Sequence, residues 1–178
     1  KYINAFPVLD ETVKEKWAQV QNQYKRRADL IPNLVKTVQG YASHEESVFK
    51  EVTEARSKAS QMTIDVSSLD DPAKIKEFEN AQKTLGGALS RLMAITENYP
   101  QLKADQNFLS LQSQLEGTEN RIAVARKDYI AAVKDYNIAL RKIPDKFIAA
   151  IFYPELKPRV TFEASEAEQS APDVSFAK

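Results

Sequence analysis

The sequence predicts an all-α protein, built as an elongated antiparallel bundle of three long helices that run up, down and up. Three observations support this fold class. Apolar residues recur in steps of three and four over three long segments, glycine is rare, at 4 of 178 residues, and no strand-like alternation occurs before the C-terminal tail. Steps of three and four place the apolar side chains in one stripe, the seam, so coiled-coil-like packing is expected.

The first helix is predicted over residues 13–62, because its apolar register is kept along that whole length. Only two seam positions are charged, Arg27 and Glu45. Pro32 falls inside the helix, where a proline removes one backbone hydrogen bond and kinks the chain. A break at Pro32 would instead give four shorter helices. The unbroken register favours one long helix with a kink.

The second helix is predicted over residues 72–99 and the third over residues 105–143. Asp71 followed by a proline is a start signal, because the carboxylate can cap the helix and proline suits its first position. Asp105 or Asn107 can cap the third helix. The connection between the two contains a proline and is expected to be extended. It would carry the chain back far enough for the first and third helices to lie parallel.

The chain after the third helix is predicted to hold one more short helix and then an extended tail. Residues 144–152 are apolar and are expected to cap the open end of the bundle, in preference to touching a membrane interface. The stretch that follows is acidic and interrupted by proline. The predicted division is therefore a helical bundle over residues 1–153 and an acidic tail over residues 154–178.

Composition limits the classes of function. The 25 basic residues balance 25 acidic ones, which argues against a general nucleic-acid binder. The absence of cysteine excludes disulfides and thiolate metal sites. The longest apolar runs fall far short of the roughly 20 residues that span a bilayer. Because the chain begins at Lys1 without an initiator methionine, we expect that an upstream segment has been removed, and a signal or an anchor is one candidate for it.

No catalytic, metal or cofactor site is predicted. His44 is the only histidine, so neither a two-histidine zinc motif nor a mixed His/Cys site can be assembled. The pair Gly86-Gly87 has no strand before it and no Lys-Ser/Thr after it, so it is not a phosphate-binding loop. The aromatic residues at helical spacing are expected in the core rather than in a platform that stacks bases. They are Trp17, Tyr24, Tyr41, Tyr129 and Tyr136.

Lys25, Arg26 and Arg27 form a basic triplet that the helical register divides. Lys25 and Arg26 fall outside the seam, where they form either an ordinary solvated face or a patch for anionic lipid or phosphate. Arg27 falls on the seam. A charge there is costly unless it is paired, so Arg27 is expected to have a carboxylate or carbonyl partner, or to extend past the seam to solvent.

The third helix carries acids and arginines on both flanks of its seam. Glu119 and Asn120 are expected to pair within the bundle, and Arg126 with a neighbouring helix. Ion pairs that fix the helix register are favoured over a polar recognition strip. The predicted structural polar network comprises Arg27, Glu45, Glu116, Glu119, Asn120, Arg121 and Arg126.

Two stretches are more specific than any heptad pattern. They are NQYKRRADLIPNLVKTVQGYASHE, residues 22–45, and NFLSLQSQLEGTENRIAVARKDYIAAVKDYN, residues 107–137. With VTEAR (52–56) and YPQLKADQNF (99–108), they resemble the LemA family of bacterial membrane-anchored proteins, over residues 2–152. The resemblance implies a helical bundle held to the membrane by one N-terminal transmembrane segment, which lies outside this sequence. It implies no enzymatic activity, cofactor or ligand.

We therefore expect a non-enzymatic interaction or scaffold domain tethered to the cell membrane, on the extracytoplasmic rather than the cytoplasmic side. A protein partner is expected, although the sequence does not identify it. No cofactor and no nucleic acid are expected, and homo-oligomerisation stays open. The alternative function is a binding module for anionic lipid or another polyanion, through the face formed by Lys25 and Arg26.

Overall fold

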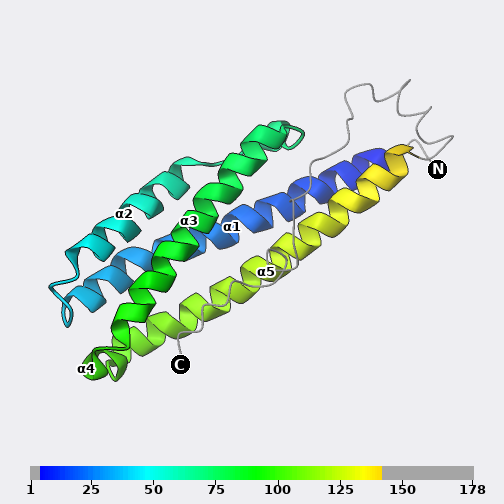
Figure 1. Ribbon diagram of the computed structural model, residues 1–178. Helices are drawn as coiled ribbons and strands as arrows, with labels where there is room; N and C mark the ends of the chain where they lie inside the picture. The colour runs from blue at the N-terminus through cyan, green and yellow to red at the C-terminus, as the bar shows by residue number, and fades with distance from the viewer. Residues whose placement is uncertain (1–4, 142–178) are drawn as a thin grey trace.

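The computed structural model describes residues 5–141, which form an elongated bundle of α-helices (Figure 1). The helices are α1 (Ala5–Gln39), α2 (Glu46–Gln61), α3 (Pro72–Thr96), α4 (Pro100–Lys103) and α5 (Gln106–Arg141), with the short 3-10 turn η1 (Val66–Ser68) before α3. No strand occurs over this range, and the all-α fold class is confirmed. The short apolar helix predicted at 144–152, the tail and the domain boundary at 153 lie outside the described residues.

The predicted first helix is in fact two helices. The chain turns between Gln39 and Glu46, where the N–H of Ala42 donates to the carbonyl of Val38 at 2.9 Å and the Ala42 side chain is buried. The prediction of one unbroken helix to residue 62 is wrong. The apolar register gave no sign of the turn, because the helices before and after the turn bury residues in the same phase. Glu45, predicted on the seam, instead lies half-buried at this turn.

The turn also reverses the predicted direction of the last helix, so that α1 and α5 are antiparallel neighbours (Figure 1). Arg27 of α1 contacts Glu119 of α5 at 3.1 Å, and Asn107, near the start of α5, donates to Thr37, near the end of α1, at 3.2 Å. The predicted parallel arrangement of the first and third long helices is therefore wrong. The helices α2 and α3 form a second antiparallel pair beside α1 and α5.

The starts of α3 and α4 follow from local chemistry. The Asp71 carboxylate caps α3 by accepting from the backbone N–H groups of Ala73 at 3.0 Å and Lys74 at 3.4 Å. The connection to α5 is not extended as predicted. Pro100 begins the helical turn α4 instead, because proline suits the first helical position, and the buried Leu102 holds this turn against the core.

The core has two apolar parts, separated by a polar layer. One part lies toward the α1–α2 turn and contains Phe49 and Phe108. The other lies toward the N-terminal end of α1, where the Trp17 ring lies 5.1 Å from the rings of Phe78 and Tyr129. The polar layer between them is centred on Arg27, which belongs to neither part.

Pro32 lies on the exposed side of α1, which continues beyond it to Gln39. A proline has no N–H, so the carbonyl of Ala28, four residues earlier, loses its helical donor. The Nε of Arg56 in α2 donates to this carbonyl at 2.9 Å. The proline thus creates an acceptor within α1 that an arginine of the neighbouring helix uses.

We expect Pro32 and Arg56 to be energetically coupled. Arg56→Met should destabilise the natural chain by about 1 kcal/mol more than it destabilises a Pro32→Ala variant, because alanine at 32 restores the helical donor to Ala28. Urea unfolding of the four proteins, followed by circular dichroism, measures the coupling. An equal cost of Arg56→Met in both backgrounds would contradict it.

Asp105 caps α5 and joins it to the α1–α2 turn. Its Oδ1 accepts from the backbone N–H of Phe108 at 2.9 Å, and its Oδ2 accepts from the Tyr41 hydroxyl at 2.6 Å. The Tyr41 bond first, and then the backbone bonds, lower the pKa of Asp105. Tyr41 is 39% exposed, so its predicted place in the core is wrong. It fastens the turn to the start of α5 instead.

The substitution Tyr41→Phe should raise the pKa of the Asp105 carboxyl toward its usual value of about 3.9. A carboxyl whose pKa is lower in the folded than in the unfolded protein stabilises the fold at pH values above its unfolded-state pKa. This stabilisation is lost as the pH falls through the folded-state pKa. The variant should therefore lose part of that stabilisation near neutral pH and show less loss of stability on acidification. An NMR titration of the carboxyl carbon tests this, with Tyr99→Phe as the control. An unchanged Asp105 titration would contradict it.

Candidate functional site

Arg27 forms the centre of the buried polar layer. Its side chain is 2% exposed, and its Nη1 donates to Glu119 Oε1 at 3.1 Å. Its Nη2 donates to Gln82 twice, to the backbone carbonyl at 2.7 Å and to Oε1 at 3.1 Å. Arg27 therefore has both kinds of partner that its seam position predicts, a carboxylate and a carbonyl. These bonds join α1, α3 and α5 at one level of the bundle.

A second buried arginine continues the polar layer along α5. Arg126 Nη1 donates to the Tyr24 hydroxyl at 2.9 Å and also pairs with the Glu79 carboxylate. Burial lowers the pKa of Arg126, but Tyr24 and Glu79 outweigh it, so the net direction is upward. Burial raises the pKa of Tyr24. The Arg27 guanidinium lies 5.1 Å from the centroid of the Tyr24 ring, which connects the two arginines through one aromatic side chain.

The structure brings only part of the predicted polar network together. Arg27, Glu119 and Arg126 are buried in the layer just described. The exposed members lie on the outer surface of α5, and they are Glu116, Asn120 and Arg121. Of the two residues expected to pair within the bundle, Glu119 does so with Arg27, whereas Asn120 is exposed, because consecutive positions on a helix point in different directions.

Glu45 lies far from this layer, and two members of the layer were not predicted. Glu45 accepts from the Tyr99 hydroxyl at 3.5 Å near the α1–α2 turn. The missed residues are Gln82 and Glu79. Gln82 had a signal, because it interrupts the apolar seam of its helix as Arg27 does in α1. Glu79 gave no such signal in the sequence. It meets its partner, Arg126, only because α3 packs against α5 in the folded protein.

A groove of about 730 Å³ lies beside the polar layer, between α1, the end of α2 and α3. The rings of Tyr24 and Phe78 and the side chain of Gln82 contribute to its lining. Lys25 and Arg56 also line it, so basic groups lie close to its apolar surface. The groove is thus adjacent to the residues that fix the bundle's interior.

The wall formed by the segment after α2 is held by specific bonds. The Gln21 side-chain amide donates to the carbonyl of Ile64 at 3.1 Å and accepts from its N–H at 3.1 Å. The Trp17 indole N–H donates to the same carbonyl at 3.2 Å. The Ile64 side chain is buried in the core. This segment is therefore fixed against α1 through backbone and side chain together.

Lys25 and Arg26 do not form one site. Both are exposed, but only Lys25 lines the groove. The ammonium of Lys25 pairs with the Asp29 carboxylate, one turn along α1, at 3.1 Å. Asp29 also lines the groove, so the charge there is mixed in sign rather than purely basic.

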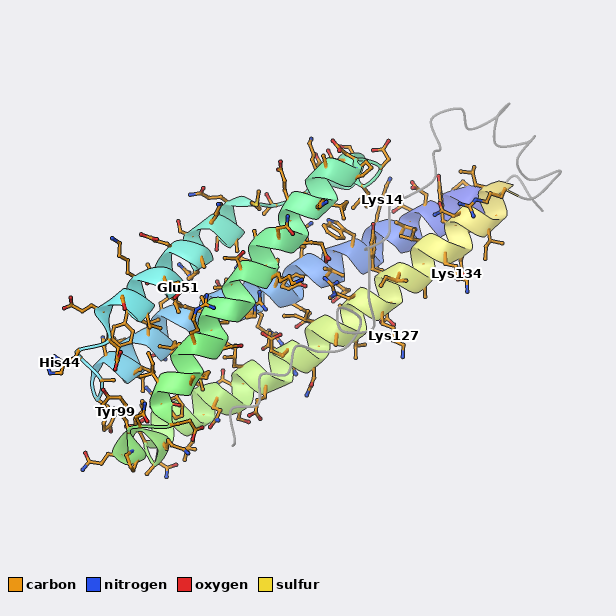
Figure 2. The ribbon with its side chains drawn as sticks, in the orientation of Figure 1. Lys14, His44, Glu51, Tyr99, Lys127 and Lys134 are labelled. Carbon is orange, nitrogen blue, oxygen red and sulfur yellow. The ribbon has the colours of Figure 1, made fainter. Side chains whose placement is uncertain are left out.

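Among residues 5–141, no group of three or more His, Cys, Asp or Glu is placed to hold a metal ion. His44 is exposed at the α1–α2 turn, where Figure 2 shows it pointing away from the bundle. None of the helices over the same range is long and apolar enough to cross a membrane.

Known proteins resemble this chain over most of its length. The sequence profile of the LemA family matches residues 16–176. Magnetosome proteins MamQ 1 and MamQ 2 of Paramagnetospirillum magneticum are each 29% identical over 164 residues, covering 83% of this chain and 60% of theirs. Protein LemA of Metamycoplasma hominis is 25% identical over 156 residues, covering 88% of this chain and 66% of its own. The chain thus spans 60% of the length of the two magnetosome relatives.

We expect Glu119→Leu to destabilise the fold by about 3–5 kcal/mol, because it leaves the Arg27 charge buried without its partner. The double variant Arg27→Met/Glu119→Leu should be less destabilised than Glu119→Leu alone, since it buries no charge. Urea unfolding at neutral pH measures all three proteins. Glu116→Leu, on the exposed side of α5, is the matched control and should change stability by about 0.5 kcal/mol or less. A double variant no more stable than Glu119→Leu would contradict this account.

Proposed function

Because the chain belongs to the LemA family, we propose that it is a non-enzymatic interaction or scaffold domain, tethered to the cell membrane on the extracytoplasmic side. Its proposed partner is a protein segment that binds in the groove between α1, α2 and α3. The observation that carries this proposal is the fixed lining of the groove. A groove that is already formed loses little conformational freedom on binding.

Two contacts support a preformed groove. The Gln21 amide holds the backbone of Ile64 on one wall. Arg56 donates to the carbonyl of Ala28, which holds α2 against α1. The mixed charges of Lys25, Arg56 and Asp29 on the lining favour a partner segment with both acidic and basic side chains.

The proposed tether agrees with the position of the helix ends. The start of α1 and the end of α5 lie at one end of the bundle, and the α1–α2 turn lies at the other (Figure 1). An anchor preceding α1 would therefore place the turn, with His44, far from the membrane. The groove would lie along the side of the projecting bundle, within reach of a partner in the same compartment.

A photo-crosslinking amino acid tests the proposed partner site in membranes that carry the full-length protein. Placed at Asn22, which lines the groove, it should give a specific protein adduct. The same group at Asn120, on the outer surface of α5, should not give that adduct. Ser60→Trp, which fills the groove, should abolish the adduct at Asn22 because it occupies the partner's place. An adduct that persists in the Ser60→Trp background would contradict the proposal.

The alternative function is binding of anionic lipid or another polyanion through Lys25 and Arg26, which their exposure at adjacent positions favours. The ion pair between Lys25 and Asp29 counts against it, because it offsets one of the two charges. Co-sedimentation with vesicles of anionic or neutral lipid separates the two proposals.

We expect Lys25→Glu/Arg26→Glu to leave vesicle binding unchanged. The control Lys58→Glu/Lys76→Glu makes the same change in net charge at exposed positions of α2 and α3. Loss of binding to anionic vesicles in the first variant alone would instead establish the alternative function.

A further inference from the structure

The outer face of α5 carries an apolar stripe. Its members, seven residues apart, are Gly117, Val124, Ala131 and Ile138, and we call them the α5 stripe. Val124 is 59% exposed and Ile138 is 41% exposed, although both are large apolar side chains. A spacing of seven keeps residues on one side of a helix, as at a single position of a coiled-coil heptad.

A charged row flanks the α5 stripe on each side. Lys127, Lys134 and Arg141 form the basic row, three positions after successive stripe residues. Asp128 and Asp135 form the acidic row, four positions after Val124 and Ala131. The rows begin at Val124, because Gly117 is followed at these two offsets by Asn120 and by the basic Arg121. Offsets of three and four lie on opposite flanks of a helix stripe. All five charged side chains belong to exposed residues, and Figure 2 shows Lys127 and Lys134 pointing away from the bundle on the same side of α5.

These two rows have no ion-pair partners within the described part of the chain. None of the five has an opposite charge three or four residues away on α5. On α1, in contrast, Lys14 pairs with Asp10 at 3.0 Å and Lys25 with Asp29 at 3.1 Å. These two lysines of α1 thus have partners on their own helix, whereas the charges beside the α5 stripe have opposite charges only in the other row.

We propose that the α5 stripe is the contact face of a parallel homodimer, in which α5 of a second copy lies alongside in register. In a two-fold parallel pair, the basic row of each copy faces the acidic row of the other on both sides of the stripe. In an antiparallel pair, the basic row of one copy would face the basic row of the other, and the two acidic rows would also face each other. Charge complementarity therefore selects both the occupant, a second copy, and its direction.

This arrangement agrees with a membrane tether but does not depend on the groove. A parallel dimer places both α1 starts at the same end, where two anchors could enter one membrane. The α5 stripe and the groove are formed by different helices, since no residue of α5 lines the groove. An experiment that rules out the dimer therefore leaves the proposed partner site in the groove untouched, and the reverse also holds.

The expected dimer is weak and salt-sensitive. The α5 stripe gives one apolar residue every two turns, and two of its four members are glycine and alanine. Flanking ion pairs between exposed side chains contribute little individually and are screened by salt. Sedimentation velocity of the whole chain should show reversible dimerisation at high protein concentration, and the dimer should dissociate as salt is raised.

Charge reversal tests the pairing of the rows. The acidic variant Lys127→Glu/Lys134→Glu and the basic variant Asp128→Lys/Asp135→Lys should each dimerise at least about tenfold more weakly, because four ion pairs become repulsive. An equimolar mixture of the two should regain a dimer, because each now complements the other. The control Lys58→Glu/Lys76→Glu should dimerise as the natural chain does.

Cysteine crosslinking tests the direction, since the natural chain contains no cysteine. The single variants Val124→Cys, Ala131→Cys and Ile138→Cys should each form a disulfide-linked dimer on oxidation, because a parallel pair in register brings every position opposite its own copy. An antiparallel pair would link at most one of the three.

Three results would overturn the proposal. They are a natural chain that stays monomeric at all concentrations, charge reversals that act no more strongly than the control, and a crosslink at only one position. A monomer whose Val124→Cys thiol is also protected from a maleimide would show that another part of the same chain covers the α5 stripe.

Discussion

The ion pair between Arg27 and Glu119 is the constraint on which the rest of the bundle depends. Two charges taken from water into a protein interior carry a large desolvation cost, which is offset only where the partners meet with good geometry. Arg27 must reach Glu119 on α5 and Gln82 on α3 together, so three helices have one acceptable register. Arg27 Nε and Glu119 Oε2 have no hydrogen-bond partner, which indicates that the pair specifies the register more than it adds stability.

Polar contacts between helices also fix the two places where the helices depart from regular geometry. Pro32 leaves the carbonyl of Ala28 without its helical donor, and Arg56 supplies one from α2. The chain reverses after Gln39, and Tyr41 ties this turn to Asp105 at the start of α5. Apolar clusters supply most of the driving force for packing, and they tolerate small shifts. Directed polar contacts determine where along α1 each neighbouring helix must lie.

The sequence predicts the helices well, because apolar periodicity and capping residues are local signals. Asp71, the α5 start at Asp105 and the need of Arg27 for a partner were all accessible in this way. The turn between Gln39 and Glu46 was not, because the apolar phase continues from α1 into α2, with only Gly40 and polar neighbours as a signal. Missing that turn reversed the inferred direction of α5, and the flank of a helix that meets a neighbour depends on that direction. Local pattern therefore could not separate the buried Glu119 from the exposed Glu116.

The buried register also determines what α5 presents to solvent. A helix turns about 100° per residue, so Val124, five positions after Glu119, lies about 140° around the helix from it. With Glu119 held inward by Arg27, Val124 is directed outward, and Ala131 and Ile138 follow at intervals of seven. The exposed stripe and its flanking charges are thus fixed by a contact inside the bundle. A shift in the Arg27 register would rotate or slide this face, so the interior pair and any partner of α5 are mechanically linked through one helix.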